Sequence, residues 1–585
     1  MPNNDDVRIL IKAFREDGFK VHRKKDVFIY EGKIGIRASH YSATNYWTKE
    51  AKKVYYLEGK PYQMGYLLGF MAEKDIAKMT DQYSDYLPFA FFGINASSTN
   101  FQKLLDRFLK FLVKRWARGM QDDIPDEYER EMAGILDGCK AANSATKVTK
   151  DDLWLLNVGF DAILAHLYPG KLLGMGMFRK QTVKVPIMCN AFSVFRQATD
   201  GKKNHYFARD FMFPDAGIYQ DTACLIIYKP DSVNGNVIYP FVSQTAPGIV
   251  GTVAAMNSHG CAIGVDMSPT AACNRKHPGF NSLLLCRHAI QYGKSADEMV
   301  DIIADAPRGV SWLYAISDGG KDKAAIVETI RKLDFQSEGK LLDYLLSFPK
   351  RKYRNILKNE PIVRQNIESY SKKERELLRR GVMVRWHDFQ YFNESKFMQL
   401  NEKLVAEYNN GAFKLKQIDY QQFDYSETGF INKYYTQKNC PSAFFFAPQR
   451  EKRDDLVLVT NSCISPEMRL LTMHSWTSLL ADQDINDIQW RYDRLNQLLL
   501  DAISEKGHVD YQTAREILDF MSPYGNYNRC YDDRQQRSPD FKEIAIGGSM
   551  SLFDLKNKTI ESHFGYYCDK WVKISLRKYL GDEKK

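Results

Sequence analysis

Hydrophobic residues recur at helical spacing through much of the first third of the chain. The segment TNFQKLLDRFLKFLVKRWARGM (99–120) places apolar side chains three and four positions apart. The segment IPDEYEREMAGILDGCKAA (124–142) opens with a proline in a first-turn position followed by acids. Residues 55–69 combine a strand-like start, a Gly-Lys-Pro turn and a helical continuation. We therefore predict a mostly helical region, after a short strand region, up to about residue 185.

The pattern changes to alternation between about residues 185 and 267. Short runs rich in β-branched and aromatic residues are separated by turn residues there, in the order CNAFSVF, HYFARDF, TACLIIY, GNVIYPFV, GIVGTVAAM and GCAIGVDM. This pattern predicts a sheet built largely of hairpins.

Helices and further hairpins are predicted beyond this sheet. Residues 281–292 have a helical pattern, and the capping-box sequence SADE (295–298) introduces another helix. A hairpin is expected at 312–330, helices at 487–503 and 510–521, and a last hairpin at 549–565. The order of strands, helices and strands indicates an α+β layered domain and not a repeating βαβ fold.

The segment from about 335 to 450 differs from its surroundings. It is rich in Lys, Arg, Tyr and Gln and contains the charged helical sequence SKKERELLRRG. A solvated insertion that packs beside the core is a better explanation of this composition than a basic binding surface.

Composition limits the classes of function. A chain of 585 residues with 44% hydrophobic and 13% aromatic residues can bury one large core. The net charge of +10 is a modest excess of 82 basic over 72 acidic residues, and no nucleic-acid-binding motif accompanies it. No nucleic-acid partner is therefore predicted.

The cysteines and the apolar segments indicate the cellular compartment in which the protein is expected. The ten cysteines are scattered singly, which favours a reducing environment. The start, MPNNDDVRIL, lacks the features of a secretion signal, and no stretch approaches the ~20 apolar residues that span a bilayer. We expect a cytoplasmic protein without stable membrane insertion, while a missing native export signal and the oligomeric state stay open.

Several catalytic signatures are absent from the sequence. It contains no GxxxxGK[ST] loop, no nucleophile elbow and no HExxH. His259 and Cys261 flank a glycine in a predicted turn, but two such residues alone do not indicate a metal site. Neither a metal nor a cofactor is predicted, which leaves cysteine chemistry.

Cys189 opens one of the predicted strands. It can be a small buried hydrophobe, and a strand start offers no helix dipole to lower the pKa of a thiol. Another base is available if the peptide bond before Cys189 is cut. The freed α-amine, with an ordinary pKa of ~7.7 to 8, would lie beside its own thiol and could take its proton.

Five segments in order carry a family resemblance: EGKPYQMGYLLG, CNAFSVFRQATDGKKNHYFARDF, GIVGTVAAMNSHGCAIGV, AAIVETI and LVLVTNSCISPEMR. Together they resemble the acyl-coenzyme A:6-aminopenicillanic acid acyltransferase-like family of self-cleaving N-terminal-nucleophile (Ntn) hydrolases. The resemblance implies a four-layer αββα sandwich. It also implies a mostly helical N-terminal segment (1–188) that becomes a small chain, and a core (189–585) with an insertion at about 335–450.

The resemblance assigns roles to three residues. Cys189 would be the nucleophile, exposed by cleavage after Met188. MNSHG matches a turn of the family, so Asn257 would supply an oxyanion-hole donor through its backbone N–H, and VTNS would place the side-chain amide of Asn461 on the same oxygen. Taken alone, Asn257 is equally a turn residue and Asn461 a strand-ending cap.

The charged residues match the family less completely. Arg209 matches the arginine beside the nucleophile, but Asp210 stands in an asparagine position and Met212 in the position of a second acid. The carboxylate that would hold the new α-amine must then be Asp210 in a shifted register, or come from elsewhere. Arg491 matches a second family arginine, with Arg494 as a competitor, and either is equally compatible with a surface helix.

The leading prediction is an autoprocessed N-terminal-cysteine amidohydrolase or acyltransferase. It would form an acyl-thioester at Cys189 from a small N-acyl amide, or an acyl thioester, and pass the acyl group to water or an amine. Two alternatives remain: a phospholipase B-like esterase with the same core, and an uncleaved protein that binds an acyl ligand or a partner without catalysis.

Overall fold

The computed structural model describes most of the chain. The described residues are 4–44, 49–92, 100–168, 189–214, 218–268, 270–349, 351–389, 396–397, 399–400, 403–404, 453–471, 484–521, 546–564 and 570–580. All statements on structure below concern these residues.

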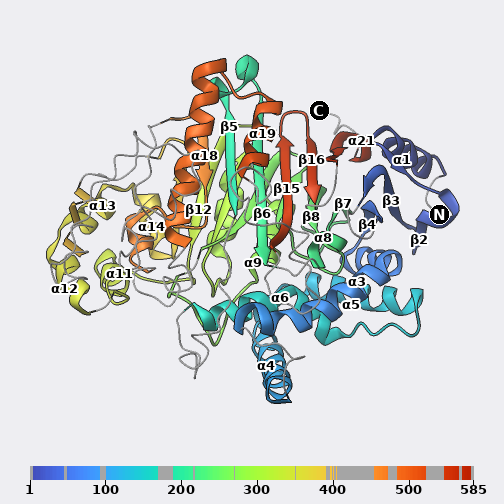
Figure 1. The fold of residues 1–585 in the computed structure, drawn as a ribbon, viewed down its shortest axis with the longest axis horizontal. Coiled ribbons are helices and arrows are strands. Elements are labelled where there is room, and N and C mark those ends of the chain that lie inside the picture. The colour runs from blue at the N-terminus through green and yellow to red at the C-terminus, as the bar shows by residue number, and fades with distance from the viewer. Residues whose placement is uncertain are drawn as a thin grey trace.

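Two β-sheets form the centre of the molecule (Figure 1). The larger has eleven strands in the order β1-β3-β4-β7-β8-β9-β10-β11-β12-β13, with β2 paired to β3. Its strands are β1 (Phe19–Lys20), β2 (Val27–Tyr30), β3 (Lys33–Thr44), β4 (Ala51–Gly59), β7 (Cys224–Pro230), β8 (Phe241–Thr245), β9 (Ala254–Asn257), β10 (Cys261–Met267), β11 (Trp312–Asp318), β12 (Lys323–Thr329) and β13 (Val382–Trp386).

The smaller sheet has six strands in the order β14-β5-β6-β15-β16-β17. These are β14 (Leu456–Val459), β5 (Asn190–Phe195), β6 (His205–Pro214), β15 (Ile546–Asp554), β16 (Thr559–Phe564) and β17 (Val572–Ser575). The sequence pattern predicted one sheet of hairpins between residues 185 and 267. The structure instead divides those strands between two sheets, because side chains of both sheets share one apolar core.

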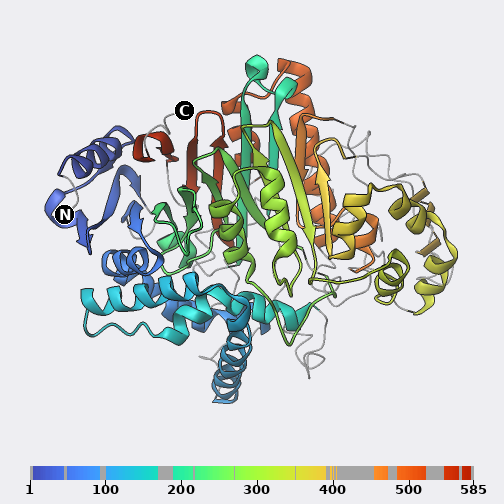
Figure 2. The same cartoon turned by 180° about the vertical axis from the view of Figure 1, so that it is seen from behind.

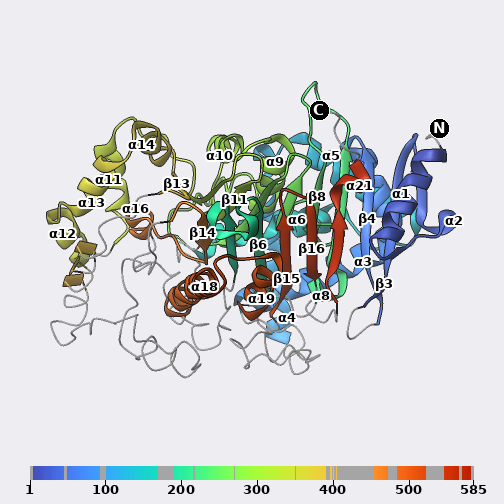
Figure 3. The same ribbon diagram turned by 90° about the horizontal axis from the view of Figure 1, so that it is seen from above.

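Helices cover both outer faces, so the layers run helix, sheet, sheet, helix. Viewed from above, helices α18 (Asp484–Lys506) and α19 (Tyr511–Met521) lie on the six-stranded sheet (Figure 3). Helices α9 (Ser282–Tyr292) and α10 (Ala296–Asp305) cover the eleven-stranded sheet, as the view from behind shows (Figure 2). A second apolar cluster lies between that sheet and its helices, and it includes Ile263 of β10 and Leu285 of α9. This is the four-layer αββα arrangement that the sequence resemblance implied.

The N-terminal part contributes both helices and strands. Its long helices are α3 (Pro61–Phe92), α4 (Asn100–Arg118), α5 (Asp126–Ala142) and α6 (Lys150–Leu167), and α1 (Asn4–Glu16) precedes the strands. The sequence predicted α4, α5 and the start of α3, whereas α6 was not predicted as a separate element. Strands β1 to β4 extend the large sheet, and β4 pairs in parallel with β7, with Val54 opposite Leu225. The described part of this N-terminal region, up to residue 168, is thus built into the sandwich.

Helices α3 and α5 cross at very close range. A Cβ added at Gly65 of α3 would lie 2.0 Å from the carbonyl oxygen of Glu131, and one added at Gly134 of α5 would lie 2.1 Å from that of Tyr62. Gly69 and Gly138 make equivalent approaches one turn later. The two backbones therefore touch only because both helices carry glycine at a spacing of four residues.

The predicted insertion is helical where the structure describes it. Its helices are α11 (Glu338–Leu345), α12 (Arg351–Asn359), α13 (Ile362–Ser369) and α14 (Lys372–Arg379). Strand β13 then returns to the edge of the large sheet, with Val384 opposite Val327. The described part of the segment is therefore anchored to the core, and residues 405–450 lie outside the described residues. Among the helices described, none is long and apolar enough to cross a membrane.

Candidate functional site

Cys189 lies at the end of the small sheet, directly before β5, and is 1% exposed. Strand β5 runs between β14 and β6, so its start meets residues from both neighbours. Asn461 follows β14 by two residues, and Arg209 is carried by β6. The sheet therefore brings together three residues that the sequence places far apart.

Asn461 connects the nucleophile position to the large sheet. Its Oδ1 accepts a hydrogen bond from the backbone N–H of Cys189 at 2.7 Å. Its Nδ2 donates to the carbonyl oxygen of Met267, at the end of β10, at 3.0 Å. The side chain is 1% exposed. Asn461 thus touches Cys189 as predicted, with its amide oxygen toward the Cys189 backbone.

Arg491 of α18 holds the same residues from the outer helix layer. Its Nη1 donates to the carbonyl oxygen of Cys189 at 2.9 Å and to Oδ1 of Asn190 at 2.8 Å. Its Nη2 donates to Oδ1 of Asn461 at 3.1 Å. Arg494, the competing arginine, instead lies over the ring of Phe520 at 5.2 Å. The structure therefore brings Arg491, and not Arg494, to Cys189.

Arg209 reaches Cys189 from inside the sandwich. Its Nη1 donates to the carbonyl oxygen of Asn190 at 3.3 Å, and its Nη2 donates to the carbonyl oxygen of Val265. Burial acts to lower the pKa of the guanidinium, but the charges of Asp266 and of a Cys189 thiolate raise it overall. A thiolate at Cys189 would thus have a fully buried cation as its neighbour.

Asp266 is a member of this group that the sequence did not reveal. Its carboxylate lies 3.6 Å from Nη2 of Arg209, and both side chains are 0% exposed. Burial raises its pKa to about 6, and Arg209 and Arg491 limit the rise. The available signal was one acid inside the otherwise uncharged strand GCAIGVDM, because a charge in a buried strand requires a partner.

Asp210 faces the outer helix layer, on the side of Arg491 and opposite to Arg209. Successive side chains of a strand point to opposite faces, so Asp210 lies opposite to Arg209 and Phe211, which face the large sheet. It shares a face with Asn190, its partner on β5, whose side chain contacts α18. The carboxylate in the layer of Arg209 is therefore Asp266.

The structure does not bring Asn257 to Cys189. Asn257 ends β9, at the turn that leads to Cys261, whereas Asn461 contacts Met267 at the far end of β10. The six steps along β10 from Cys261 to Met267 correspond to about 20 Å of strand. The buried side chain of Asn257 donates to the carbonyl oxygens of Ile290 and Gly293 at 3.0 and 2.8 Å. Its described contacts are those of a turn residue that attaches α9 to the sheet.

A cavity of about 50 Å³ opens beside Cys189. Its wall is formed mostly by aromatic and aliphatic side chains, together with Asn157 and Asn281, and none of its described lining residues carries a charge. Prominent among them are Phe160, Phe211, Tyr219, Leu283 and Trp312. The nucleophile position therefore adjoins an apolar enclosure.

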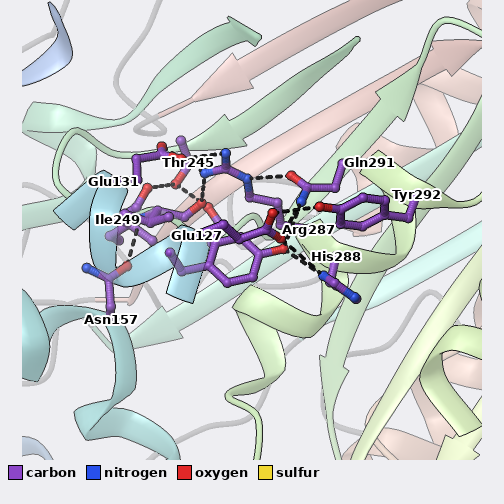
Figure 4. A network of polar contacts seen from close by, with 12 residues as sticks. Glu127, Glu131, Asn157, Thr245, Ile249, Arg287, His288, Gln291 and Tyr292 are labelled. Carbon is purple, nitrogen blue, oxygen red and sulfur yellow. Dashed lines mark hydrogen bonds and ion pairs between the residues drawn. The ribbon is translucent and has the colours of Figure 1, made fainter. Parts of the chain in front are cut away.

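The loop at 246–253, which supplies part of this wall, is fixed by buried polar side chains (Figure 4). Oδ1 of Asn157 accepts the backbone N–H of Val250 at 2.7 Å. Arg287 donates to the carbonyl oxygen of Val250 at 2.7 Å and to both carboxylate oxygens of Glu131, at 2.9 and 2.6 Å. The loop is thus held between α5, α6 and α9, and the wall beside Cys189 is rigidly placed.

His259 lies in the turn after β9 and Cys261 begins β10, away from this cavity. Within the described ranges, no group of three or more His, Cys, Asp or Glu residues is arranged to hold a metal ion. The chemistry available at Cys189 is therefore that of a buried thiol, two guanidinium groups, an amide and a carboxylate.

The fold is a layered αββα sandwich, and its candidate nucleophile is a buried cysteine at the start of an inner strand. The family model of acyl-coenzyme A:6-aminopenicillanic acid acyl-transferase matches residues 208–343. The match confirms the resemblance that the ordered motifs predicted, over this part of the chain. The matched range includes Arg209 and Asp266, while Cys189, Asn461 and Arg491 lie outside it.

Two further comparisons describe similar proteins. A protein of Archaeoglobus fulgidus described as uncharacterized is 27% identical over 527 residues, which are 90% of this chain and 66% of that protein. This chain thus spans just under two thirds of the length of that relative. A mutant of conjugated bile acid hydrolase from Clostridium perfringens aligns at 12% identity with a TM-score of 0.31, over 68% of this chain and 95% of that one. A second variant of the same hydrolase aligns at 11% identity with the same TM-score.

Proposed function

We propose that the protein is a self-processing N-terminal-cysteine amidohydrolase or acyltransferase, with Cys189 as its nucleophile. The observation that carries the proposal is the convergence of Asn461, Arg491 and Arg209 on Cys189, beside an uncharged cavity. Asn461 and Arg491 bond the main chain of Cys189, and Arg209 is the buried cation beside its thiol.

The first reaction would be cleavage of the chain before Cys189. The Cys189 thiol attacks the carbonyl carbon of Met188, and the acyl group moves from nitrogen to sulfur, which forms a thioester and frees the α-amine. Water then attacks the thioester carbonyl, which releases Met188 as a carboxylate and restores the thiol. After this step Cys189 carries an amine where the backbone N–H now contacts Oδ1 of Asn461.

The second reaction repeats this chemistry on a substrate. The α-amine takes the thiol proton, the thiolate attacks the substrate carbonyl, and the resulting oxyanion collapses as the leaving nitrogen receives the proton from the amine. The acyl group of the thioester then passes to water or to an amine, and the thiol of Cys189 is restored. Arg209 would stabilise the thiolate, and the second N–H of the Asn461 amide, beyond the one bonded to Met267, would serve the oxyanion.

Asp266 takes the place of the acid that the sequence leaves missing at Met212. It lies in the interior layer with Arg209, and its charge also acts on Arg491. Because both arginines hold Cys189 or Asn190, the carboxylate would fix the cations around the nucleophile and accept a hydrogen bond from the new α-ammonium group. This role supports the proposed reaction without requiring a second acid on β6.

The cavity indicates the acyl group. An uncharged wall rich in aromatic side chains favours an aliphatic or aromatic acyl group and disfavours one that carries a carboxylate. An N-acyl amide with an apolar acyl part is therefore the proposed substrate class. The same wall would accept the acyl chain of a lipid ester, so the esterase alternative is kept as an outcome of the test.

The test is a substrate panel combined with trapping of the intermediate. N-acyl amides with an aliphatic, an aromatic and a dicarboxylic acyl group are incubated with the purified protein, beside a lysophospholipid and a Cys189→Ala control. The proposal predicts turnover of the apolar amides, and an acyl hydroxamate when hydroxylamine is added. Turnover of the lysophospholipid alone would favour the esterase, and no turnover with an uncleaved chain would favour a binding protein.

A further inference from the structure

Helix α4 projects from the body of the molecule. In Figures 1 and 2 it extends away from the two sheets, below the layer that contains α5 and α6. It spans Asn100–Arg118, or 19 residues, which corresponds to about 29 Å at 1.5 Å per residue. The reaction proposed for Cys189 gives this helix no role.

One face of α4 is attached to the protein. Leu109 and Val113 form a small apolar cluster with Leu155 and Ile163 of α6, separate from the main cores. Trp154 of α6 also donates from its indole nitrogen to the carbonyl oxygen of Ala117, at 2.9 Å. The helix is therefore fixed on α6 along this face and does not need its remaining apolar residues for packing there.

A second apolar face of α4 is exposed. Leu104, Phe108 and Phe111 are 66%, 54% and 60% exposed, and their spacing places them on one side of the helix. The other large apolar residues that the structure describes as exposed, Ile9, Ile29, Tyr41 and Val237, lie apart on other parts of the chain. Among the residues whose exposure the structure describes, only those of α4 form such a stripe.

Positive charge accompanies this stripe. The helix has six basic residues and one acidic residue, a net charge of +5: Lys103, Arg107, Lys110, Lys114, Arg115 and Arg118, with Asp106. At 100° per residue, Arg107 and Arg118 lie beside the exposed stripe, Arg115 lies in line with it one turn beyond Phe111, and Lys114 and Lys103 lie farther round on the same side as Arg107. Lys110, Lys114 and Arg118 pair with aspartates, whereas Lys103, Arg107 and Arg115 are exposed.

We propose that α4 binds the surface of an anionic lipid bilayer. Two exposed phenylalanines and a leucine bordered by lysine and arginine are the pattern of a helix that lies in the membrane interface. The stripe would enter the boundary between headgroups and acyl chains while the cations contact lipid phosphates. A protein partner or a second copy would cover the stripe as well, but neither requires a cationic border on a projecting helix.

This position relates the membrane to the cavity beside Cys189. Leu155 of α6 packs against α4, while its neighbours Leu156 and Asn157 line the cavity. Tyr83 of α3 contacts the α4 cluster and lines the cavity as well. Helix α4 therefore packs directly on helices that form part of the cavity wall. The binding proposal itself does not depend on the catalytic proposal.

The experiment is flotation of the full chain with lipid vesicles. Vesicles of phosphatidylcholine alone are compared with vesicles that also contain phosphatidylserine, at low and high salt. The wild-type protein should float with the anionic vesicles, and salt should weaken the association. A Leu104→Ser/Phe108→Ser/Phe111→Ser variant should bind at least about tenfold more weakly, and each neutralisation in Lys103→Gln/Arg107→Gln should cost about fivefold.

An Ile9→Ser/Val237→Ser variant is the matched control, because it removes exposed apolar side chains elsewhere. It should bind like the wild type, and circular dichroism should show that all variants are folded. Lack of flotation by the wild type, or unchanged flotation of the triple variant, would overturn the proposal. A wild-type dimer that the triple substitution dissociates, without vesicle binding, would assign the stripe to a second copy instead.

Discussion

The backbone N–H of Cys189 donates to Oδ1 of Asn461 at 2.7 Å in the uncut chain. The nitrogen that would become the α-amine therefore already has its acceptor before the peptide bond is broken. Arg491 holds the same oxygen at 3.1 Å and the carbonyl oxygen of Cys189 at 2.9 Å. The site is thus organised around the main chain of Cys189 as well as its thiol.

Substitution of Asn461 separates its two roles. Asn461→Asp keeps an oxygen for Cys189 and Arg491 but removes the Nδ2 donors, while Asn461→Ala removes both. If Nδ2 serves the oxyanion, both variants should process and turn over about 10²–10³-fold more slowly. The aspartate variant should remain closer to wild type in its free energy of unfolding. Full activity of Asn461→Asp would show that the donor is not needed.

Arg491 and Arg494 form a natural pair for comparison on one helix. Arg491→Lys replaces a guanidinium that makes three described hydrogen bonds with a single ammonium group, so it should cost about 2 kcal/mol or more in the free energy of unfolding and slow cleavage. Arg494→Lys, whose parent side chain lies over Phe520, should change cleavage little. Urea denaturation and the time course of processing measure both effects. Equal behaviour of the two variants would argue against the role of Arg491.

Asp266 gives the stability a defined pH dependence. Its pKa rises from the ordinary 3.8 to about 6 in the folded protein. Between these values the folded chain keeps a proton that the unfolded chain has lost, so this contribution is complete below pH 3.8 and disappears as the pH rises through 6. The slope within the window is at most about 1.4 kcal/mol per pH unit.

Asp266→Asn cannot titrate and should lack this component. The difference in free energy of unfolding between wild type and variant, from urea denaturation, should change across the window and be constant above it. Parallel stability curves of the two proteins over the whole range would contradict the pKa assigned to Asp266.

The close crossing of α3 and α5 predicts a steric effect. Gly65→Ala would place a Cβ 2.0 Å from a backbone oxygen of α5, which neither helix can accommodate without moving apart. We expect a loss of about 1–3 kcal/mol in the free energy of unfolding. Gly339→Ala is the control, because nothing lies within 4 Å of the added Cβ and the residue is also helical. The prediction fails if the two substitutions have the same effect on the melting temperature.

Local patterns predicted most of the elements but not how they assemble. The hairpins β11–β12 and β15–β16 and helices α4, α5, α18 and α19 follow from periodicity and turn residues, because those signals act over neighbouring positions. The division of the strands into two sheets, and the parallel pairing of β4 with β7, depend on contacts between distant segments. Periodicity carries no information on such pairing.

The site was predictable only in part for the same reason. Cys189, Asn461, Arg491 and Arg209 were found through ordered motifs, and the structure brings them together. The motif around Asn257 is also typical of a turn, and this turn lies at the end of β10 that is remote from Cys189. Asp266 lies in an ordinary strand, and its importance becomes visible only when Arg209 of the other sheet is placed against it.

The central claim is that the chain cuts itself before Cys189. The direct test is denaturing mass spectrometry of the freshly purified protein beside a Cys189→Ala variant. The account predicts two fragments of 188 and 397 residues that together account for the 67.6 kDa chain, the larger beginning at Cys189, and an intact variant. A wild-type chain that stays intact under conditions in which it turns over substrate would contradict it, because Cys189 would then have no α-amine to act as its base.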